Sequence, residues 1–194
     1  MVASIDSAID SNGTSGPLGN DTDRALLGVM RREHGGVFVG ASTAKNENYQ
    51  PSKHPGVRLF IAARNPDHDW DLPLWRDDRT TLVTTYGTPN SDVPAHVQTI
   101  RAGHGDLDLY EALVQIRRLG VTHLSCEGGP RINAAFVGAD LFDEVSLTLS
   151  PLAVGGTIQR SVGIETFEPR RFRLAAHAAD GDWVFLRYLR DRSG

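Results

Sequence analysis

Apolar positions along the chain follow two alternating patterns, one with helical spacing and one of short continuous runs. Leu26, Leu27 and Met30 recur at helical spacing, and Asp21 or Thr22 can cap the start of this segment. Residues 106–119 show the same amphipathic spacing and are followed by a glycine. The sequence therefore predicts two amphipathic helices, the first beginning near Asp21 and the second covering residues 106–119.

The short continuous runs predict strands. They lie at residues 2–5, 37–40, 58–63, 80–85 and 121–126. The run at 58–63 is almost wholly apolar, which suits a strand that is covered on both faces. A polar segment at 43–49 indicates a short helix or turn directly after the strand at 37–40. This alternation of strands and helices is typical of an α/β fold with helices on both faces of a sheet.

The C-terminal part of the chain differs, because two predicted strands follow each other there with only a turn between them. Residues 143–149 alternate like a strand, and residues 172–177 and 183–189 flank Asp180-Gly181, which predicts a hairpin with a type I′ turn. We expect a mixed, mostly parallel sheet that ends in this antiparallel hairpin. No linker or repeat divides the chain, so a single domain over residues 1–194 is expected.

Composition narrows the functional classes. The chain has 194 residues, a formal net charge of −4, and Cys126 as its single cysteine. One cysteine excludes an internal disulfide and suits the cytoplasm, and the negative charge disfavours nucleic-acid binding. The first residues lack an export signal, and the apolar runs are too short to cross a membrane. The seven histidines do not follow a metal-binding spacing, so no metal is expected.

The stretch Glu127-Gly128-Gly129-Pro130 is the most informative one for chemistry. The two glycines follow a predicted strand, and Pro130 suits the first position of a short helix that runs through Phe136. Glycines let the backbone approach a pyrophosphate closely, and the N-terminus of a helix favours its negative charge. A tight strand-to-helix turn without any ligand explains the same residues, so the spacing alone leaves both interpretations open.

Several motifs together give the chain a resemblance to a known family. Glu127-Gly128-Gly129-Pro130 is followed by A-D-L-F-D-E-V at 139–145 and S-P-L-A-V-G-G at 150–156. Upstream lie A-S-I-D at 3–6, S-G-P-L at 15–18, Met30-Arg31, V-G-A-S-T at 39–43 and E-N-Y at 47–49. This combination spans nearly the whole chain and resembles the pyrimidine reductase domain of the riboflavin biosynthesis family.

The resemblance implies a dihydrofolate-reductase-like, three-layer α-β-α fold and an NADPH-dependent reductase. The implied reaction reduces the ribosylamino group of a 5-amino-6-(5-phosphoribosylamino)pyrimidine to ribitylamino, with a hydride taken from the cofactor. A homodimer that associates through the strands around residues 183–189 is also implied. Two alternatives stay open: an NADPH-dependent dihydrofolate or pterin-type reductase on the same fold, and a non-catalytic nucleotide-binding protein.

The family pattern also assigns residues to the cofactor. The pyrophosphate contact falls on Gly128, Gly129, Pro130, Arg131 and Ile132, the nicotinamide or ribose contact on Thr43 and Glu47, and the 2′-phosphate contact on Arg64. Thr43, Glu47 and Arg64 each have a structural alternative. Thr43 can cap a helix, Glu47 can be a solvated charge, and Arg64 can pair with Asp67 on the surface.

For the substrate, the resemblance assigns the phosphate to Ser15 and Arg31, and the pyrimidine ring to Glu127, Asp6 and Asp23. A guanidinium suits a phosphate, and a carboxylate can accept two N–H donors of a ring. Arg31 can instead serve as a cation at the end of its helix, Glu127 as an acceptor for nearby amides, and the aspartates as caps. Asp6 and Glu127 are the candidates for catalysis, although the sequence does not identify a proton donor.

The chain departs from the family pattern in three ways. Ser7 replaces the glycine of the usual Ser-Leu-Asp-Gly, which restricts the backbone if a positive φ is needed there. The chain begins at Met1, close to this motif, so the first strand is expected to be short or incomplete. Bifunctional members also carry a zinc deaminase domain with an H-x-E and P-C-x-x-C signature, which is absent here and predicts a stand-alone reductase.

Overall fold

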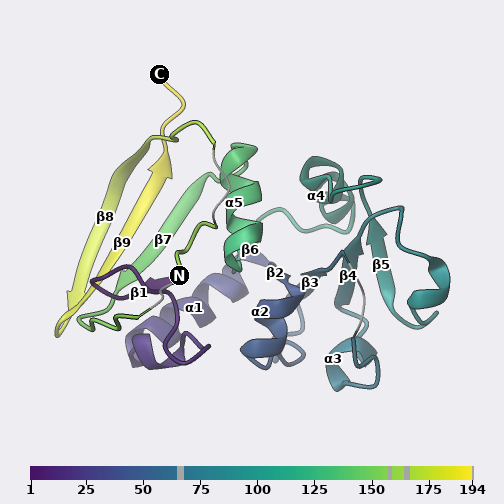
Figure 1. The fold of residues 1–194 in the computed structure, drawn as a ribbon, viewed down its shortest axis with the longest axis horizontal. Helices are drawn as coiled ribbons and strands as arrows, with labels where there is room; N and C mark the ends of the chain where they lie inside the picture. The colour runs from purple at the N-terminus through teal and green to yellow at the C-terminus, as the bar shows by residue number, and fades with distance from the viewer. Residues whose placement is uncertain (65–67, 157–158, 164–166, 194) are drawn as a thin grey trace. The chain divides into compact units, whose positions relative to one another are not determined.

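The computed structural model describes residues 1–64, 68–156, 159–163 and 167–193 (Figure 1). By its internal contacts the chain divides into a terminal unit, made of Met1–Gly28 with Gly128–Gly194, and a central unit, Val29–Glu127. The elements in chain order are β1 (Val2–Ala3), η1 (Gly16–Leu18), α1 (Asp21–His34), β2 (Gly36–Gly40), α2 (Ala41–Asn46), β3 (Arg58–Ala62), α3 (Pro73–Arg76), β4 (Thr80–Thr84), η2 (Asn90–Asp92), β5 (Gln98–Arg101), α4 (Leu109–Arg118), β6 (Ser125–Cys126), α5 (Pro130–Gly138), β7 (Glu144–Leu149), β8 (Phe172–Asp180) and β9 (Trp183–Arg190).

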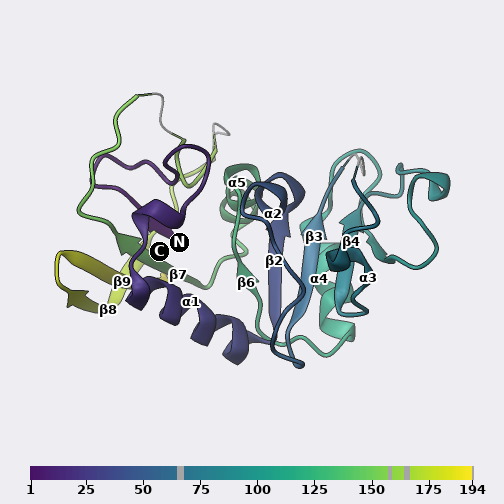
Figure 2. The ribbon, with the colours of Figure 1, turned by 90° about the horizontal axis from the view of Figure 1, so that it is seen from below.

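The central unit is built on a parallel sheet with the strand order β5-β4-β3-β2-β6. Figure 2 shows β2, β3 and β4 side by side in this sheet. Helices α2 and α3 lie on one side of it and α4 on the other (Figure 1). Because all five strands run in the same direction, their carboxyl ends meet at one edge, and the loops that follow β3, β4 and β5 start there.

Alternating side chains of these strands fill a core on both faces of the parallel sheet. On one face Val39 and Ile61 pack in a buried cluster with Trp75 of α3. On the other face Phe38 and Phe60 are paired in register and fully buried. Burial on both faces explains the almost continuous apolar character of the strand sequences.

The terminal unit contains a four-stranded sheet with the order β1-β7-β9-β8. β1 pairs parallel to β7, whereas β7 with β9 and β9 with β8 are antiparallel. The first residue of β1, Val2, lies opposite Thr148 near the end of β7. The first and last parts of the chain thus share one sheet, which confirms an α/β fold with a parallel sheet and antiparallel C-terminal strands. The described strands form two hydrogen-bonded sheets, where the sequence suggested a single mixed one.

Most of the predicted elements are present, but two predicted strands are shorter than expected and one strand was missed. The strand predicted at 2–5 is only Val2–Ala3. The strand predicted at 121–126 is only Ser125–Cys126, because residues 121–124 lie outside the ladder with β2. β5 was not predicted, since its sequence Q-T-I-R carries a single strongly apolar residue. It forms because its backbone pairs with β4, and only Ile100 among its four side chains is buried.

Two local predictions were wrong. The helix α1 is capped neither by Asp21 nor by Thr22: the Asn20 side chain accepts a hydrogen bond from the Asp23 N–H at 2.9 Å, which makes Asn20 the N-cap. The hairpin turn is Gly181-Asp182, because Asp180 already pairs with Trp183. Only Gly181 has a positive φ there, 56°, whereas a type I′ turn requires positive φ at both central residues, so the turn is of the II′ kind.

Among the described residues, no helix has both the length and the apolar character that a bilayer crossing requires.

Candidate functional site

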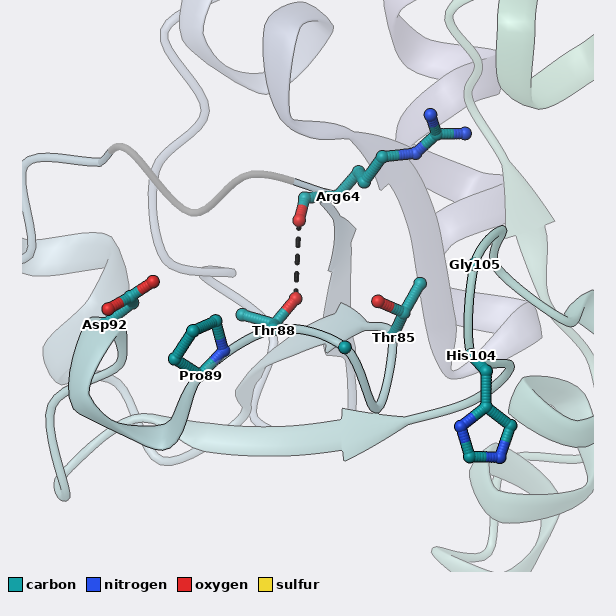
Figure 3. Close-up of a pocket in the computed structure, with 8 residues that line it drawn as sticks. Arg64, Thr85, Thr88, Pro89, Asp92, His104 and Gly105 are labelled. Carbon is teal, nitrogen blue, oxygen red and sulfur yellow. Dashed lines mark hydrogen bonds between the residues drawn. The ribbon is translucent and has the colours of Figure 1, made fainter.

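A cavity of about 280 Å³ opens at the carboxyl edge of the parallel sheet in the central unit (Figure 3). Its wall comes from the segments after β3, β4 and β5, which the parallel topology brings together. The lining residues are Arg64, Thr85, Gly87, Thr88, Pro89, Asp92, His104 and Gly105. Arg64 carries a guanidinium and His104 an imidazole, and Asp92 adds one carboxylate, so the lining residues suit a phosphorylated polar ligand.

Hydrogen bonds between the loops fix the shape of this cavity. The Thr88 hydroxyl donates to the Arg64 carbonyl at 3.3 Å, and Figure 3 shows this bond joining the loops that follow β3 and β4. Arg101 donates from Nη1 to the carbonyl oxygens of Thr85 at 3.1 Å and Thr88 at 2.6 Å. Gly87 is also constrained, since a Cβ there would come within 2.9 Å of the His104 carbonyl oxygen. The rim is thus built from backbone groups that neighbouring loops hold in place.

Arg64, to which the family pattern assigned the 2′-phosphate contact, lines this cavity, and its cofactor role stays a prediction. Its guanidinium pairs with Asp106, and both side chains are largely exposed, 73% and 83% respectively. The partner considered in the sequence, Asp67, lies outside the described residues. An exposed ion pair contributes about 0–1 kcal/mol, so an incoming phosphate can displace Asp106 from Arg64 at little cost.

A second polar cluster in the central unit joins Arg31, Tyr49 and Glu127. Arg31 donates two parallel hydrogen bonds to the Glu127 carboxylate, from Nε to Oε1 at 2.7 Å and from Nη2 to Oε2 at 2.5 Å. The Tyr49 hydroxyl donates to Oε2 of the same carboxylate and accepts from Arg31 Nη2 at 3.3 Å. The guanidinium carbon also lies 5.2 Å from the centroid of the Tyr49 ring. Arg31 and Glu127, to which the sequence assigned separate roles, therefore form one hydrogen-bonded cluster. Its third member is Tyr49, for which the sequence indicated no role.

The protonation states in this cluster follow from burial and from the ion pair. Hydrogen bonding to Glu127 raises the pKa of Arg31 beyond its already high ordinary value, so the guanidinium stays charged. Burial, reinforced by the Glu127 carboxylate, raises the pKa of Tyr49 well above its ordinary value. Tyr49 is therefore a neutral phenol at physiological pH, and its proton points to Glu127.

The local sequence explains why Tyr49 reaches this cluster. Helix α2 ends at Asn46, and Asn48 adopts the left-handed conformation with φ 49°. The Tyr49 N–H then returns to the Ala44 carbonyl at 2.8 Å and the Asn48 N–H to the Lys45 carbonyl at 3.1 Å. These two bonds form a Schellman motif, in which asparagine is a common substitute for glycine at the left-handed position.

Thr43 and Glu47 lie on the same short helix and at its end. Thr43 is the third residue of α2, whose N-cap is Gly40, so Thr43 does not cap this helix. Glu47 is the C-cap, half-buried, and donates its N–H to the Thr43 carbonyl at 2.9 Å. Both residues follow the carboxyl end of β2, which is compatible with the cofactor contact expected for them but does not test it.

In the terminal unit, the two glycines and the proline form the start of α5. Gly128 is buried with φ 81°, the Gly128-Gly129 peptide bond is cis, and Gly129 is the N-cap of the helix that begins at Pro130. A Cβ on Gly128 would lie 3.2 Å from the Asn133 side-chain amide. Position 128 therefore favours glycine for its conformation, and a Cβ there would also require the Asn133 side chain to shift slightly. Arg131 is exposed and Ile132 half-buried in the first turn of the helix.

Asp6 uses its carboxylate within the terminal unit itself. It accepts hydrogen bonds from the Ser4 hydroxyl at 2.5 Å and from the N–H groups of Val154 at 3.1 Å and Gly155 at 2.7 Å. The Ser4 bond, followed by those of the two amides, lowers the pKa of Asp6 to about 2. Asp6 therefore ties the chain after β1 to the S-P-L-A-V-G-G segment, a contact that the sequence did not indicate, and its catalytic role stays a prediction.

The remaining two predicted residues of the terminal unit lie at the start of α1 and before η1. Asp23 accepts a bond from the Thr148 hydroxyl at 2.6 Å, and a Cβ on Gly19 would come within 2.6 Å of its other oxygen. Ser15 is the residue before η1, and its carbonyl accepts from the Leu18 N–H at 3.0 Å. Asp23 and Ser15 thus have structural contacts, which leave their substrate roles as predictions. No cluster suitable for a metal ion occurs among the residues that the structure describes.

The family model described as the RibD C-terminal domain matches residues 1–186. A 2,5-diamino-6-ribosylamino-4(3H)-pyrimidinone 5′-phosphate reductase from Methanothermobacter thermautotrophicus is 26% identical over 175 residues, which are 81% of this chain and 78% of the relative.

Solved structures with the same fold extend the comparison. A pyrimidine reductase-like protein from Corynebacterium diphtheriae superposes with a TM-score of 0.87 at 22% identity, over 99% of this chain and 90% of that one. A dihydrofolate reductase from Enterococcus faecalis, crystallised with NADP(H), superposes with a TM-score of 0.55 at 11% identity, over 98% and 93%. At these identities the two likenesses establish the fold, which is that of dihydrofolate reductase.

Proposed function

Because the chain belongs to the RibD C-terminal domain family, we propose that it is an NADPH-dependent reductase acting on a ribosylamino-pyrimidine phosphate. The product would be the corresponding ribitylamino compound. Its relatives at 26% identity include reductases of a diamino-ribosylamino-pyrimidinone phosphate, which supports this substrate class. We take the two units to work as one reductase domain over residues 1–194.

The cavity at the carboxyl edge of the parallel sheet is the observation that supports the cofactor best. Arg64 with its guanidinium and His104 with its imidazole are among the residues that line it, together with Thr85 and Thr88. This donor set suits the 2′-phosphate that distinguishes NADPH from NADH, since a guanidinium binds phosphate with two parallel bonds. We assign the 2′-phosphate to Arg64, assisted by His104.

The remaining assignments follow the family pattern. In the central unit Thr43 and Glu47 would contact the nicotinamide or its ribose, and Glu127 a ring N–H. In the terminal unit the N-terminus of α5, from Gly128 to Ile132, would bind the pyrophosphate, and Ser15 and Asp23 the substrate. Arg31 would reach the substrate phosphate through Nη1, because its Nε and Nη2 atoms are bound to Glu127.

The chemistry that the cofactor supplies is hydride transfer. In the substrate, the ring-opened ribosylamino group is an imine, whose carbon receives the hydride while its nitrogen takes a proton from solvent. The protein then has to orient the two molecules and hold their phosphates. Asp6 is bound by three donors within its own unit, so this proposal gives it a structural task and no part in proton transfer.

The proposal is tested by measuring NADPH and NADH oxidation with the ribosylamino-pyrimidine phosphate and with dihydrofolate. We expect turnover with NADPH and the pyrimidine substrate, and little with dihydrofolate. Turnover only with dihydrofolate would favour a pterin-type reductase on the same fold. Absence of turnover with either substrate would favour a non-catalytic nucleotide-binding protein and overturn the proposal.

The 2′-phosphate assignment has its own test in Arg64→Ala. The KM for NADPH should rise about tenfold, which corresponds to about 1.4 kcal/mol of binding energy, while kinetics with NADH should not change. Arg76→Ala is the matched control, since Arg76 forms a similarly exposed pair with Asp71 at 2.7 Å in the same unit. An equal loss with both cofactors would assign Arg64 to a structural role.

A homodimer formed by the C-terminal strands belongs to the same proposal. β8 is an edge strand of its sheet, and its residues after Phe172 are exposed in the single chain. An exposed edge strand offers unpaired backbone groups to a second copy. Light scattering should give a mass of about twice 21.1 kDa, and a monomer mass at the concentration of the activity assay would contradict the dimer.

A further inference from the structure

The acceptor sites of the Glu127 carboxylate are nearly all used within the central unit. Oε2 accepts from Arg31 Nη2 and from the Tyr49 hydroxyl, while Oε1 accepts from Arg31 Nε. A carboxylate has about four acceptor sites, so three of these are filled and one site on Oε1 is left. Only 9% of the Glu127 side chain is exposed, so this remaining site has a fixed direction.

Tyr49 contributes something that Arg31 alone does not provide. The Arg31 side chain is 35% exposed and lies on the last turn of α1, whereas Tyr49 comes from the segment after α2. Glu127 is therefore held from two separate elements, and its own N–H donates to the Phe38 carbonyl of β2 at 2.8 Å. With the backbone and both carboxylate oxygens bound, rotation of the carboxylate about its axis is blocked.

We propose that Tyr49 is a positioning residue for the reductase, which with Arg31 locks the Glu127 carboxylate so that a single Oε1 site faces a ligand N–H. This inference rests on the proposed function for the identity of that ligand. The single acceptor site left on the carboxylate suits a neutral N–H donor, such as an N–H of the substrate pyrimidine or of a carboxamide. Tyr49 itself touches neither hydride donor nor acceptor in this scheme.

The alternative, in which Tyr49 donates a proton to the substrate, conflicts with its surroundings. Its hydroxyl proton is directed at Glu127, and burial keeps its pKa well above the ordinary value, so it holds the proton firmly. A proton donor would instead need a pKa near the working pH. The tyrosine hydroxyl thus acts on catalysis only through the carboxylate that it binds.

The first experiment is a double-mutant cycle on kcat/KM with Tyr49→Phe and Glu127→Gln. Tyr49→Phe keeps the ring against Arg31 and removes only the hydroxyl, and we expect kcat/KM for the pyrimidine substrate to fall about tenfold. In the Glu127→Gln background the same change should cost less than twofold, because the carboxylate it positions is gone. Tyr110→Phe removes the hydroxyl of a tyrosine that is 72% exposed and should leave kcat/KM unchanged.

A second measurement does not depend on activity. The chain has four tyrosines, so the ionisation of Tyr49 can be followed by subtracting the tyrosinate absorbance of Tyr49→Phe from that of the wild type. The subtracted titration should lie above the ordinary range of tyrosine, and in Glu127→Gln it should move down, because a neutral amide replaces the carboxylate. Circular dichroism of each variant shows whether it is folded.

These outcomes separate the inference from the proposed function. An active wild type with equal, additive losses in the cycle, or with no loss in Tyr49→Phe, overturns the positioning role while the reductase assignment stands. A wild type without turnover refutes the reductase assignment, and the tyrosinate titration then still decides whether Tyr49 and Glu127 are coupled. An unmoved titration in Glu127→Gln overturns the lock in either case.

Discussion

The parallel sheet of the central unit and the four-stranded sheet of the terminal unit bury their strands to different extents. Every residue of β4 is buried, and so are Phe38 and Phe60 in β2 and β3. By contrast, β8 is exposed beyond its first residue, and Leu174 in it is 48% exposed. The first sheet therefore gains its stability from apolar burial, whereas the second leaves one strand available to a partner.

The two units also use polar groups differently. In the central unit the polar groups of the candidate site are gathered at strand ends, around the cavity of Arg64 and around the Arg31–Tyr49–Glu127 cluster. In the terminal unit the Asp6 carboxylate accepts hydrogen bonds that connect two segments of the chain. Two carboxylates of the family motifs thus differ in their partners: Glu127 is bound by side chains, whereas Asp6 is bound by one hydroxyl and two backbone N–H groups.

The largest effect that tests this difference is expected from Phe60→Ala. Phe60 is fully buried, so its truncation should lower the free energy of unfolding by about 3–5 kcal/mol. The matched change in the exposed strand, Leu174→Ala, should cost less than about 0.5 kcal/mol in the monomer. Urea denaturation of both variants provides the comparison. Similar losses would mean that β8 is covered by the protein itself or by a second copy.

A smaller effect, of opposite sign, is expected from Ser7→Gly in the terminal unit. Ser7 has φ 73°, which a glycine adopts without strain, so this variant should be more stable by about 0.5–1 kcal/mol. Ser42→Gly is the control, because Ser42 lies within α2 and glycine there should destabilise by about 0.5–1 kcal/mol. Thermal denaturation distinguishes the two. A destabilised Ser7→Gly would indicate that the serine side chain makes a contact more valuable than the relief of strain.

The smallest effect concerns acid sensitivity around Asp6. Its pKa is lowered to about 2 in the folded protein, chiefly by the Ser4 hydroxyl, compared with an ordinary value of 3.8. A lowered pKa gives stability that is present above the ordinary value and is lost as the pH falls through about 2. The difference in unfolding free energy between the wild type and Asp6→Asn should therefore shrink between pH 5 and pH 2. A constant difference would contradict the hydrogen bonds described for Asp6.

The elements with strong local patterns were predictable from the sequence. Leu26, Leu27 and Met30 located α1 by their helical spacing, although no residue of α1 is buried in the single chain. The apolar run at 58–63 located β3, because a strand that is buried on both faces is apolar at nearly every position. β5 left little trace, since its strand character comes from backbone pairing with β4. Ser7 stands where the family pattern has glycine, which indicated that a positive φ could be needed at this position. The structure has φ 73° there, so the serine adopts the left-handed conformation.

The sequence named some residues of the candidate site but none of the contacts between them. Arg31 and Glu127 were assigned through motifs and Arg64 through its place after a strand, whereas the bond between Arg31 and Glu127 spans 96 positions and depends on the fold. Tyr49 belongs to the E-N-Y motif, which by itself indicates no role for the tyrosine. Its signal was Asn48 after a short helix, a common left-handed end that turns the next side chain back. His104 had no local signal, because only the parallel topology brings it to the cavity.

The pairing of β1 with β7 sets an order on how this protein can be assembled. Val2 precedes every other described strand, yet its partner Thr148 is made only after the whole central unit has been synthesised. All five strands of the parallel sheet lie within Val29–Glu127 and are then available to pair, whereas β1 still lacks its partner strand β7. During synthesis β1 therefore stays unpaired until β7 has been made.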